Sequence, residues 1–139
     1  METTSVLQKL IPSIINVSIV FLLASPFLFM KLPLAKKRLI LIGLFLLYNL
    51  FFLIFFDSRD IGMMIVKTYW KDSYPIINQL IYAILYTGSF ATLVCWIRYP
   101  FDLFIFNMLC LQLPCILLTG TTLHGHLSGN MVTIIMGVK

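Results

Sequence analysis

Acidic side chains are scarce in this sequence. The chain of 139 residues has five Asp and Glu against ten Lys and Arg, and only 11% of it is charged. Soluble domains carry about 25% charged residues, so a water-facing globular fold is excluded. The carboxylates lie at or beyond the ends of long apolar runs, at Glu2, Asp57, Asp60, Asp72 and Asp102. A proton-coupled carrier would need an ionisable group at membrane depth, and acid–base catalysis would need paired carboxylates. Neither pattern is present.

Cysteine and histidine are equally rare. The three cysteines, Cys95, Cys110 and Cys115, stand in apolar surroundings, and an odd number at such positions is no disulfide framework. The two histidines, His124 and His126, occur together in LHGHLSGNM, with no carboxylate within 20 residues. A zinc site takes three or four ligands. We therefore expect no metal site and no cofactor.

What the sequence has in abundance is apolar residues, which make up 60% of the chain. Four runs approach or exceed the length of about 20 residues that a membrane helix needs, at 11–30, 39–56, 74–97 and 101–119. In lipid only helices and closed barrels satisfy the backbone, and these runs lack the period-two alternation of barrel strands. The sequence predicts an all-α integral membrane protein. Its single domain, 1–139, would hold about four transmembrane helices in a small bundle within a lipid bilayer.

The basic residues indicate orientation. The net charge of +5 comes from residues at the ends of apolar runs, not from the wettable basic stripe that nucleic-acid binding requires. Four of them crowd one short loop, 31–38: Lys31, Lys36, Lys37 and Arg38. By the positive-inside rule we expect this loop on the cytoplasmic side of a bacterial inner membrane or the matrix side of an organellar one. Loop 57–73 would then lie outside.

Two connections carry further predictions. In loop 57–73, Ile61, Met64, Ile65 and Tyr69 recur at helical spacing, which predicts an amphipathic helix on the bilayer surface. The link between the third and fourth runs is very short. A tight antiparallel hairpin of these two helices is therefore expected.

The third run carries small residues at four-residue intervals, an arrangement that lets membrane helices approach closely. We interpret these residues as a packing face toward this chain or a partner, with a polar lining for a substrate path as the alternative. The stripe consists of Ala83, Thr87, Ala91 and Cys95, with Gly88 and Thr92 as a second pair.

Five amide side chains lie within or next to the apolar runs: Asn16, Asn49, Asn78, Asn107 and Gln112. A buried amide costs free energy unless it is hydrogen-bonded, so these side chains should face other helices. Pro114 leaves a backbone carbonyl near Cys110 without a partner. The fourth helix is therefore expected to kink there or to open locally for a ligand.

The stretch LHGHLSGNM holds the remaining candidate cluster, His124, His126 and Asn130. Its HLSGNM resembles the His-x-x-x-Asn element of rhomboid intramembrane proteases and that of CAAX-type membrane proteases. The rhomboid resemblance would imply that His126 and Asn130 hold an oxyanion. The rhomboid G-x-S nucleophile and the CAAX glutamates are both absent. We interpret the stretch as a partly wet turn with exposed histidines, followed by an interfacial or re-entrant segment, 128–138.

These observations predict a non-catalytic membrane protein that serves as a subunit or an accessory, regulatory component of a membrane complex. Its partners would be other membrane subunits or copies of itself. The alternative is a homo-oligomeric channel or small transporter with an uncharged polar lining. A third hypothesis is an embedded enzyme that uses His124, His126 and Asn130.

Overall fold

The computed structural model describes residues 2–135, and it is mostly helical. Four helices are long and apolar enough to span a membrane, as predicted, which suggests a multi-pass membrane protein. They are α1 (Val6–Leu28), α2 (Leu34–Phe56), α4 (Ile76–Val94) and the continuous helix Asp102–Thr119. The last consists of α5 (Asp102–Phe106), the π-helical turn η1 (Asn107–Gln112) and α6 (Leu113–Thr119).

The first helix begins at Val6, ahead of the apolar run, because Ser5 caps it. The Ser5 hydroxyl accepts the Gln8 N–H, while the Gln8 side chain accepts the Ser5 N–H at 2.8 Å. This reciprocal capping box satisfies two N–H groups that a helix start otherwise leaves unpaired. Lys9 therefore lies in the first turns of α1, near the N-terminal end of that helix.

The apolar core is built by α1, α2 and α4. Its centre is Phe45 on α2, whose ring stacks on Phe90 of α4 at 4.2 Å and meets Tyr86 edge-on at 5.0 Å. Val20 and Ala24 of α1 complete the contact and are fully buried. Among the described residues, the helix Asp102–Thr119 contributes none to this core cluster.

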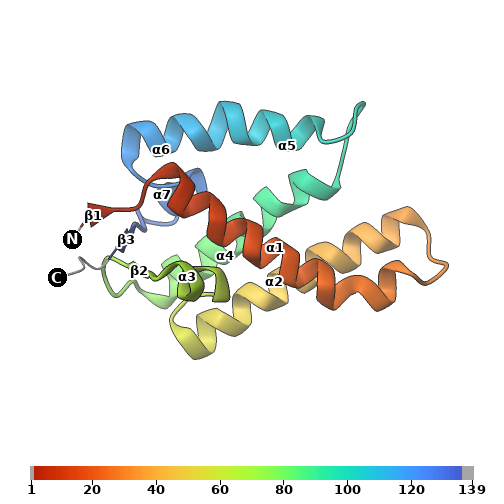
Figure 1. Ribbon diagram of the computed structural model, residues 1–139, viewed down its shortest axis with the longest axis horizontal. Coiled ribbons are helices and arrows are strands. Elements are labelled where there is room, and N and C mark those ends of the chain that lie inside the picture. The colour runs from red at the N-terminus through yellow and green to blue at the C-terminus, as the bar shows by residue number, and fades with distance from the viewer. Residues whose placement is uncertain (1, 136–139) are drawn as a thin grey trace.

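The fourth helix is therefore attached at a few points outside this core: near its two ends, and in its middle through the bond from Asn107 to Ser89 of α4. It meets α4 through α5, near the short connection, and α6 meets the following helix, α7 (Leu123–Leu127). The predicted hairpin of the third and fourth helices keeps its short connection, but it is not tight: α5–α6 diverges from α4 beyond the connection (Figure 1), and a chamber opens between it, α1 and α4.

A π-helical turn in the fourth helix sets its polar face. The Leu113 N–H bonds to the Met108 carbonyl, five residues earlier. Asn107 and Gln112 would lie about 140° apart on a regular α-helix, but i→i+5 bonding brings positions five apart toward one face. The sequence predicted a kink or a local opening around Pro114, and the irregular turn immediately precedes this proline.

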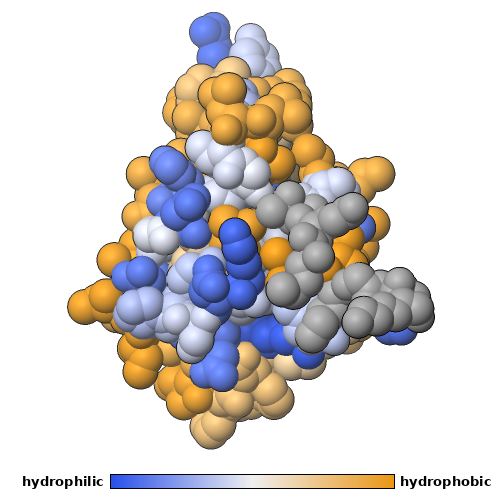
Figure 2. All heavy atoms as spheres, turned by 90° about the vertical axis from the view of Figure 1, so that its left-hand side faces the viewer, coloured by the Kyte–Doolittle hydropathy of each residue, from blue (hydrophilic) through white to orange (hydrophobic). Residues whose placement is uncertain are grey.

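Short strands that the sequence analysis did not predict form a cap at one end of the bundle. β1 (Glu2–Thr3) and β2 (Thr68–Trp70) both pair antiparallel with a central β3 (Thr133–Ile135). Thr3 pairs with Ile134, and Trp70 pairs with Thr133. With α3 (Ile61–Val66) and α7, these strands lie at the left of Figure 1. Seen from that side, hydrophilic residues gather centrally and apolar residues surround them (Figure 2).

The structure of this cap differs from two of the predictions made from the sequence. The amphipathic helix expected to reach Tyr69 ends at Val66, because Lys67 adopts a left-handed backbone with φ 61° and Tyr69 continues into β2. α3 packs against α1 with Gly62 and Met63 buried, so its inner face contacts protein. In segment 128–138, the part 133–135 is a strand, and 136–138 lies outside the described residues.

The basic loop lies at the opposite end of the bundle. Arg38, at the start of α2, places its guanidinium 5.4 Å from the Trp96 ring centroid in the α4–α5 connection. The carboxylate of Asp102 accepts N–H groups of that same connection, including Arg98 at 2.8 Å. The basic end and the polar cap thus mark the two ends of the helices.

Candidate functional site

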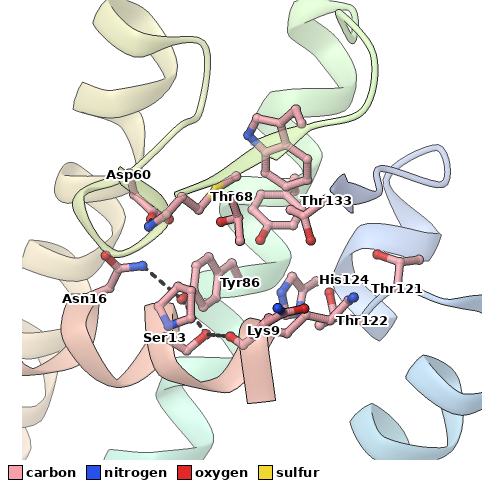
Figure 3. Close-up of a pocket in the computed structure, with 15 residues that line it drawn as sticks. Lys9, Ser13, Asn16, Asp60, Thr68, Tyr86, Thr121, Thr122, His124 and Thr133 are labelled. Atoms are coloured by element: carbon pink, nitrogen blue, oxygen red, sulfur yellow. Dashed lines mark hydrogen bonds between the residues drawn. The ribbon is translucent and has the colours of Figure 1, made fainter. Parts of the chain in front are cut away.

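A small polar cavity lies under the cap, between α1, α3, α4 and α7. It encloses about 40 Å³, which is room for about two or three water molecules. Figure 3 shows Lys9, Thr122 and His124 together on one side of it, and Asp60 and Asn16 on the opposite side. Three tyrosine or tryptophan rings and several hydroxyl groups complete the wall: Tyr82, Tyr86, Trp70, Ser13, Thr68, Thr121 and Thr133.

Asn16 is the junction of the helices at this cavity. Its side-chain oxygen accepts the Tyr48 hydroxyl at 2.7 Å and the Gly62 N–H at 3.0 Å, and its amide donates to Tyr86 at 3.3 Å. The Tyr86 hydroxyl donates onward to Ser13 at 2.9 Å. Because Asn16 is 1% exposed, this network orders α1, α2, α3 and α4 around one amide.

Asp60 is a buried carboxylate at the start of α3. It caps that helix by accepting the Met63 N–H at 2.9 Å. Burial disfavours the charged form and raises the pKa of Asp60 to about 6, although the Met63 bond and the charge of Arg59 partly offset it. This carboxyl group therefore changes charge near neutral pH.

His124 is buried beside the cavity, contrary to the prediction that both histidines are exposed. Its ring stacks on Tyr86 with centroids 4.9 Å apart, and it meets Tyr82 edge-on at 5.0 Å. Burial lowers the pKa of His124 to about 3, so the ring is neutral at physiological pH. Its Nδ1 atom is buried and has no hydrogen-bond partner among the described residues. Buried polar atoms are nearly always paired, so this atom marks an unsatisfied hydrogen-bonding position in the wall of the site.

Lys9 supplies a positive charge to the same side of the cavity. Its ammonium group donates to the carbonyl and to the hydroxyl of Thr4, each at 2.5 Å. Thr4 is in turn fixed to β3, because its N–H donates to the Thr133 carbonyl at 3.1 Å. An ammonium group has three N–H donors, so one remains for a further acceptor.

A larger apolar chamber adjoins the polar cavity. It measures about 320 Å³ and lies between α1, α4 and the helix α5–α6, a volume in the range of about 300–1,000 Å³ typical of small-ligand sites. Its wall is mainly aliphatic and aromatic, with Val17, Phe90, Phe104, Met108, Leu113 and Ile116 among its members. The chamber and the polar cavity share five residues, so they meet along one boundary: Lys9, Ser13, Tyr86, Thr122 and His124.

No family model matches this chain. No curated protein and no solved structure matches it either. The function of the site is therefore inferred from its own side chains. Within residues 2–135, no three His, Cys, Asp or Glu side chains lie close enough together to hold a metal ion. What the site offers is a cation, hydroxyl groups and a neutral imidazole beside an apolar chamber, an arrangement suited to binding.

The small residues of α4 fall on two different faces. Ala83 and Thr87 are buried at 2% and 6% exposure, and Ala91 and Cys95 are half-buried. Gly88 is exposed, with no atom within 4 Å of the position that a Cβ would take. Its companion Thr92 is half-buried and donates to the Ser89 carbonyl at 2.6 Å.

Most of the predicted amides bond within the chain. Asn107 donates to Ser89 at 2.8 Å, and Gln112 accepts the Leu123 N–H at 3.0 Å. Asn49 donates to the Phe45 carbonyl in its own helix at 2.9 Å. Asn78 is half-buried and lies against Gly129, where an added Cβ would come within 2.5 Å of its amide nitrogen.

The cluster of His124, His126 and Asn130 is not assembled. His124 is buried, while His126 and Asn130 are exposed. Asn130 has a left-handed backbone with φ 58° and precedes the strand β3.

Sequence reasoning missed Asp60 and Lys9 as site residues. Both were treated as charges at the ends of apolar runs, and nothing in their spacing predicts that the cap folds over them. A usable signal for Asp60 was its position directly before IGMMIV, where an aspartate is a good helix N-cap.

Proposed function

We propose that this protein is a non-catalytic membrane protein that binds an amphiphilic ligand and acts as an accessory or regulatory component of a membrane complex. The observation that carries the proposal is the boundary between the two cavities, where Nδ1 of buried His124, which has no partner within residues 2–135, lies in the wall shared with an apolar chamber. A ligand with an apolar tail and a polar head matches both halves of that boundary. The tail would take the chamber, and the head would reach His124.

The pore hypothesis has less support from the geometry. A homo-oligomeric channel would need polar groups that face outward from the helices. Asn107, Gln112 and Asn16, which were expected to face other helices, bond inward to groups of the same chain. The exposed surface of the long helices carries many large apolar side chains, such as Leu22, Ile54 and Leu118.

The enzyme hypothesis also has less support. Its three residues do not meet, because His126 and Asn130 are exposed while His124 is buried. Asp60 and His124 lie on opposite sides of the cavity (Figure 3), and the Asp60 carboxylate is engaged with the Met63 N–H. Without a reaction of its own, the chain would act through a partner whose state depends on the bound amphiphile.

We further propose that the protein lies in a bacterial inner membrane or an organellar membrane, with loop 31–38 on the cytoplasmic or matrix side.

Photolabelling with a diazirine-bearing hexadecanol tests the binding function. We expect labelled peptides from α1 and from η1–α6, because these segments face each other across the chamber. Met108→Trp should reduce labelling strongly, since the indole occupies chamber volume. Leu117→Trp is the matched control on the same helix, because Leu117 is 72% exposed and does not line the chamber.

Equal labelling of the wild type and Met108→Trp would contradict binding in the chamber.

The native mass in mild detergent tests the accessory role independently. Co-purification with an unrelated chain supports that role, whereas a ring of identical chains supports the pore.

A further inference from the structure

The boundary between the cavities carries a net positive charge. Among the described residues that line the apolar chamber, Lys9 alone is charged. Asp60 lines the polar cavity but not the chamber, and it lies on the side away from Lys9 (Figure 3). A head group that enters from the chamber therefore meets the ammonium group before it meets the carboxylate.

The donors at this boundary converge on one small space. Lys9 uses two of its three N–H donors on Thr4 and is held there, because Thr4 is bonded to β3. The Thr122 hydroxyl and the neutral ring of His124 line the same side. A fixed ammonium group with a free N–H, beside a hydroxyl, is an arrangement that accepts an anion through charge-assisted hydrogen bonds.

The two volumes indicate which chemical group fits each part of the site. The polar cavity encloses about 40 Å³, which accommodates a carboxylate group but no glycerophosphate head. The chamber of about 320 Å³ is at the lower end of small-ligand sites, which favours one chain over two. The volume of the chamber and the positive charge at its boundary therefore both favour a carboxylate with a single alkyl chain.

We propose that the ligand is a long-chain fatty acid, with its carboxylate at Lys9, Thr122 and His124 and its alkyl chain between α1 and α5–α6. This assignment rests on the proposed amphiphile-binding function and specifies its substrate class. The carboxylate accepts the free N–H of Lys9. Neutral His124 can donate from Nδ1 to the second carboxylate oxygen in the corresponding tautomer, which gives the orphaned atom its partner.

Native mass spectrometry of the detergent-purified chain, given equal concentrations of palmitate, hexadecanol and dioleoylphosphatidylglycerol, tests this inference. We expect one palmitate per chain, bound at least about tenfold more tightly than hexadecanol, because the neutral head loses a charge-assisted bond. Lys9→Gln should lower palmitate binding to the level of hexadecanol, and Lys9→Arg should retain the preference. Lys67→Gln, an exposed lysine of the cap, is the matched control and should change nothing.

The outcomes separate the two proposals. Equal binding of palmitate and hexadecanol to the wild type, or an unchanged preference in Lys9→Gln, overturns the carboxylate assignment while leaving amphiphile binding in place. Preference for the phosphatidylglycerol also overturns it, in favour of a glycerophospholipid. Binding of none of the three contradicts the proposed function itself. If Lys9→Gln does not fold, the wild-type comparison decides alone.

Discussion

Replacing Gly62 with alanine is expected to destabilise the protein by about 3 kcal/mol or more, at or above the top of the usual range for an overpacked core. A Cβ at this position would overlap the Pro12 carbonyl oxygen and lie 2.7 Å from the Pro12 Cα. Both are backbone atoms, so neither can rotate away. α3 would have to move off α1, and the bond from the Gly62 N–H to Asn16 would break with it.

Gly88→Ala provides the matched control in this experiment. Gly88 lies inside α4 with open space around it, so alanine should raise stability by about 0.5–1 kcal/mol through its better helix propensity. The measurement is the unfolding temperature of both variants in the same detergent. A Gly62→Ala protein as stable as the wild type would show that α3 is not packed against the Pro12 backbone.

The two buried titratable groups of the cap should give opposite dependences of stability on pH. The pKa of Asp60 is about 6 in the folded protein and near 3.8 ordinarily, so the folded state holds the proton more tightly. Its contribution to stability grows as the pH falls through 6. The pKa of His124 is about 3 when folded and near 6.5 ordinarily, so the unfolded chain takes up the proton first. Its contribution is lost as the pH falls below 6.5.

At 1.36 kcal/mol per pKa unit, lowering the pH from 7 to 4.5 changes stability by about +2 kcal/mol through Asp60 and about −3 kcal/mol through His124. The effects nearly cancel in the wild type, so single variants are needed to separate them. Asp60→Asn should lose stability over this range. His124→Phe, which keeps a ring to stack on Tyr86, should gain stability.

Unfolding temperatures at pH 7 and pH 4.5 check this prediction. His126→Phe, at an exposed histidine, should follow the wild type. The same pH dependence in Asp60→Asn and His124→Phe would mean that neither group changes its pKa on folding, because the two contributions have opposite signs.

The helices were predictable because their signal is local. Runs such as LILIGLFLL have only one stable backbone in lipid, and α1, α2, α4 and the helix Asp102–Thr119 follow from that constraint. The spacing of the fourth helix from α4 was not predictable. It depends on the π-helical turn at Asn107–Gln112 and on the attachment of α6 to α7, and neither leaves a pattern in the sequence.

The candidate site was largely hidden from sequence reasoning because its members come from distant segments. Lys9 and Asp60 are 51 positions apart in the sequence, and His124 follows Asp60 by another 64. His124 attracted attention as a rare residue type, but His124 and His126 are alike in composition and spacing. What separates them is the direction in which the short helix α7 turns its buried face, and only tertiary contacts determine that direction.

The order of the cap strands bears on how the protein is made. β3 is the central strand, yet it follows all four long helices in the sequence, whereas its neighbours β1 and β2 precede the third. During synthesis, β1 and β2 therefore emerge without the partner that pairs their backbone, and loop closure over such separations is slow. Thr133 of β3 lines the polar cavity, so the cavity lacks this part of its wall until β3 is made. Closure of the cavity is thus a late step of folding, which follows the synthesis of all four long helices.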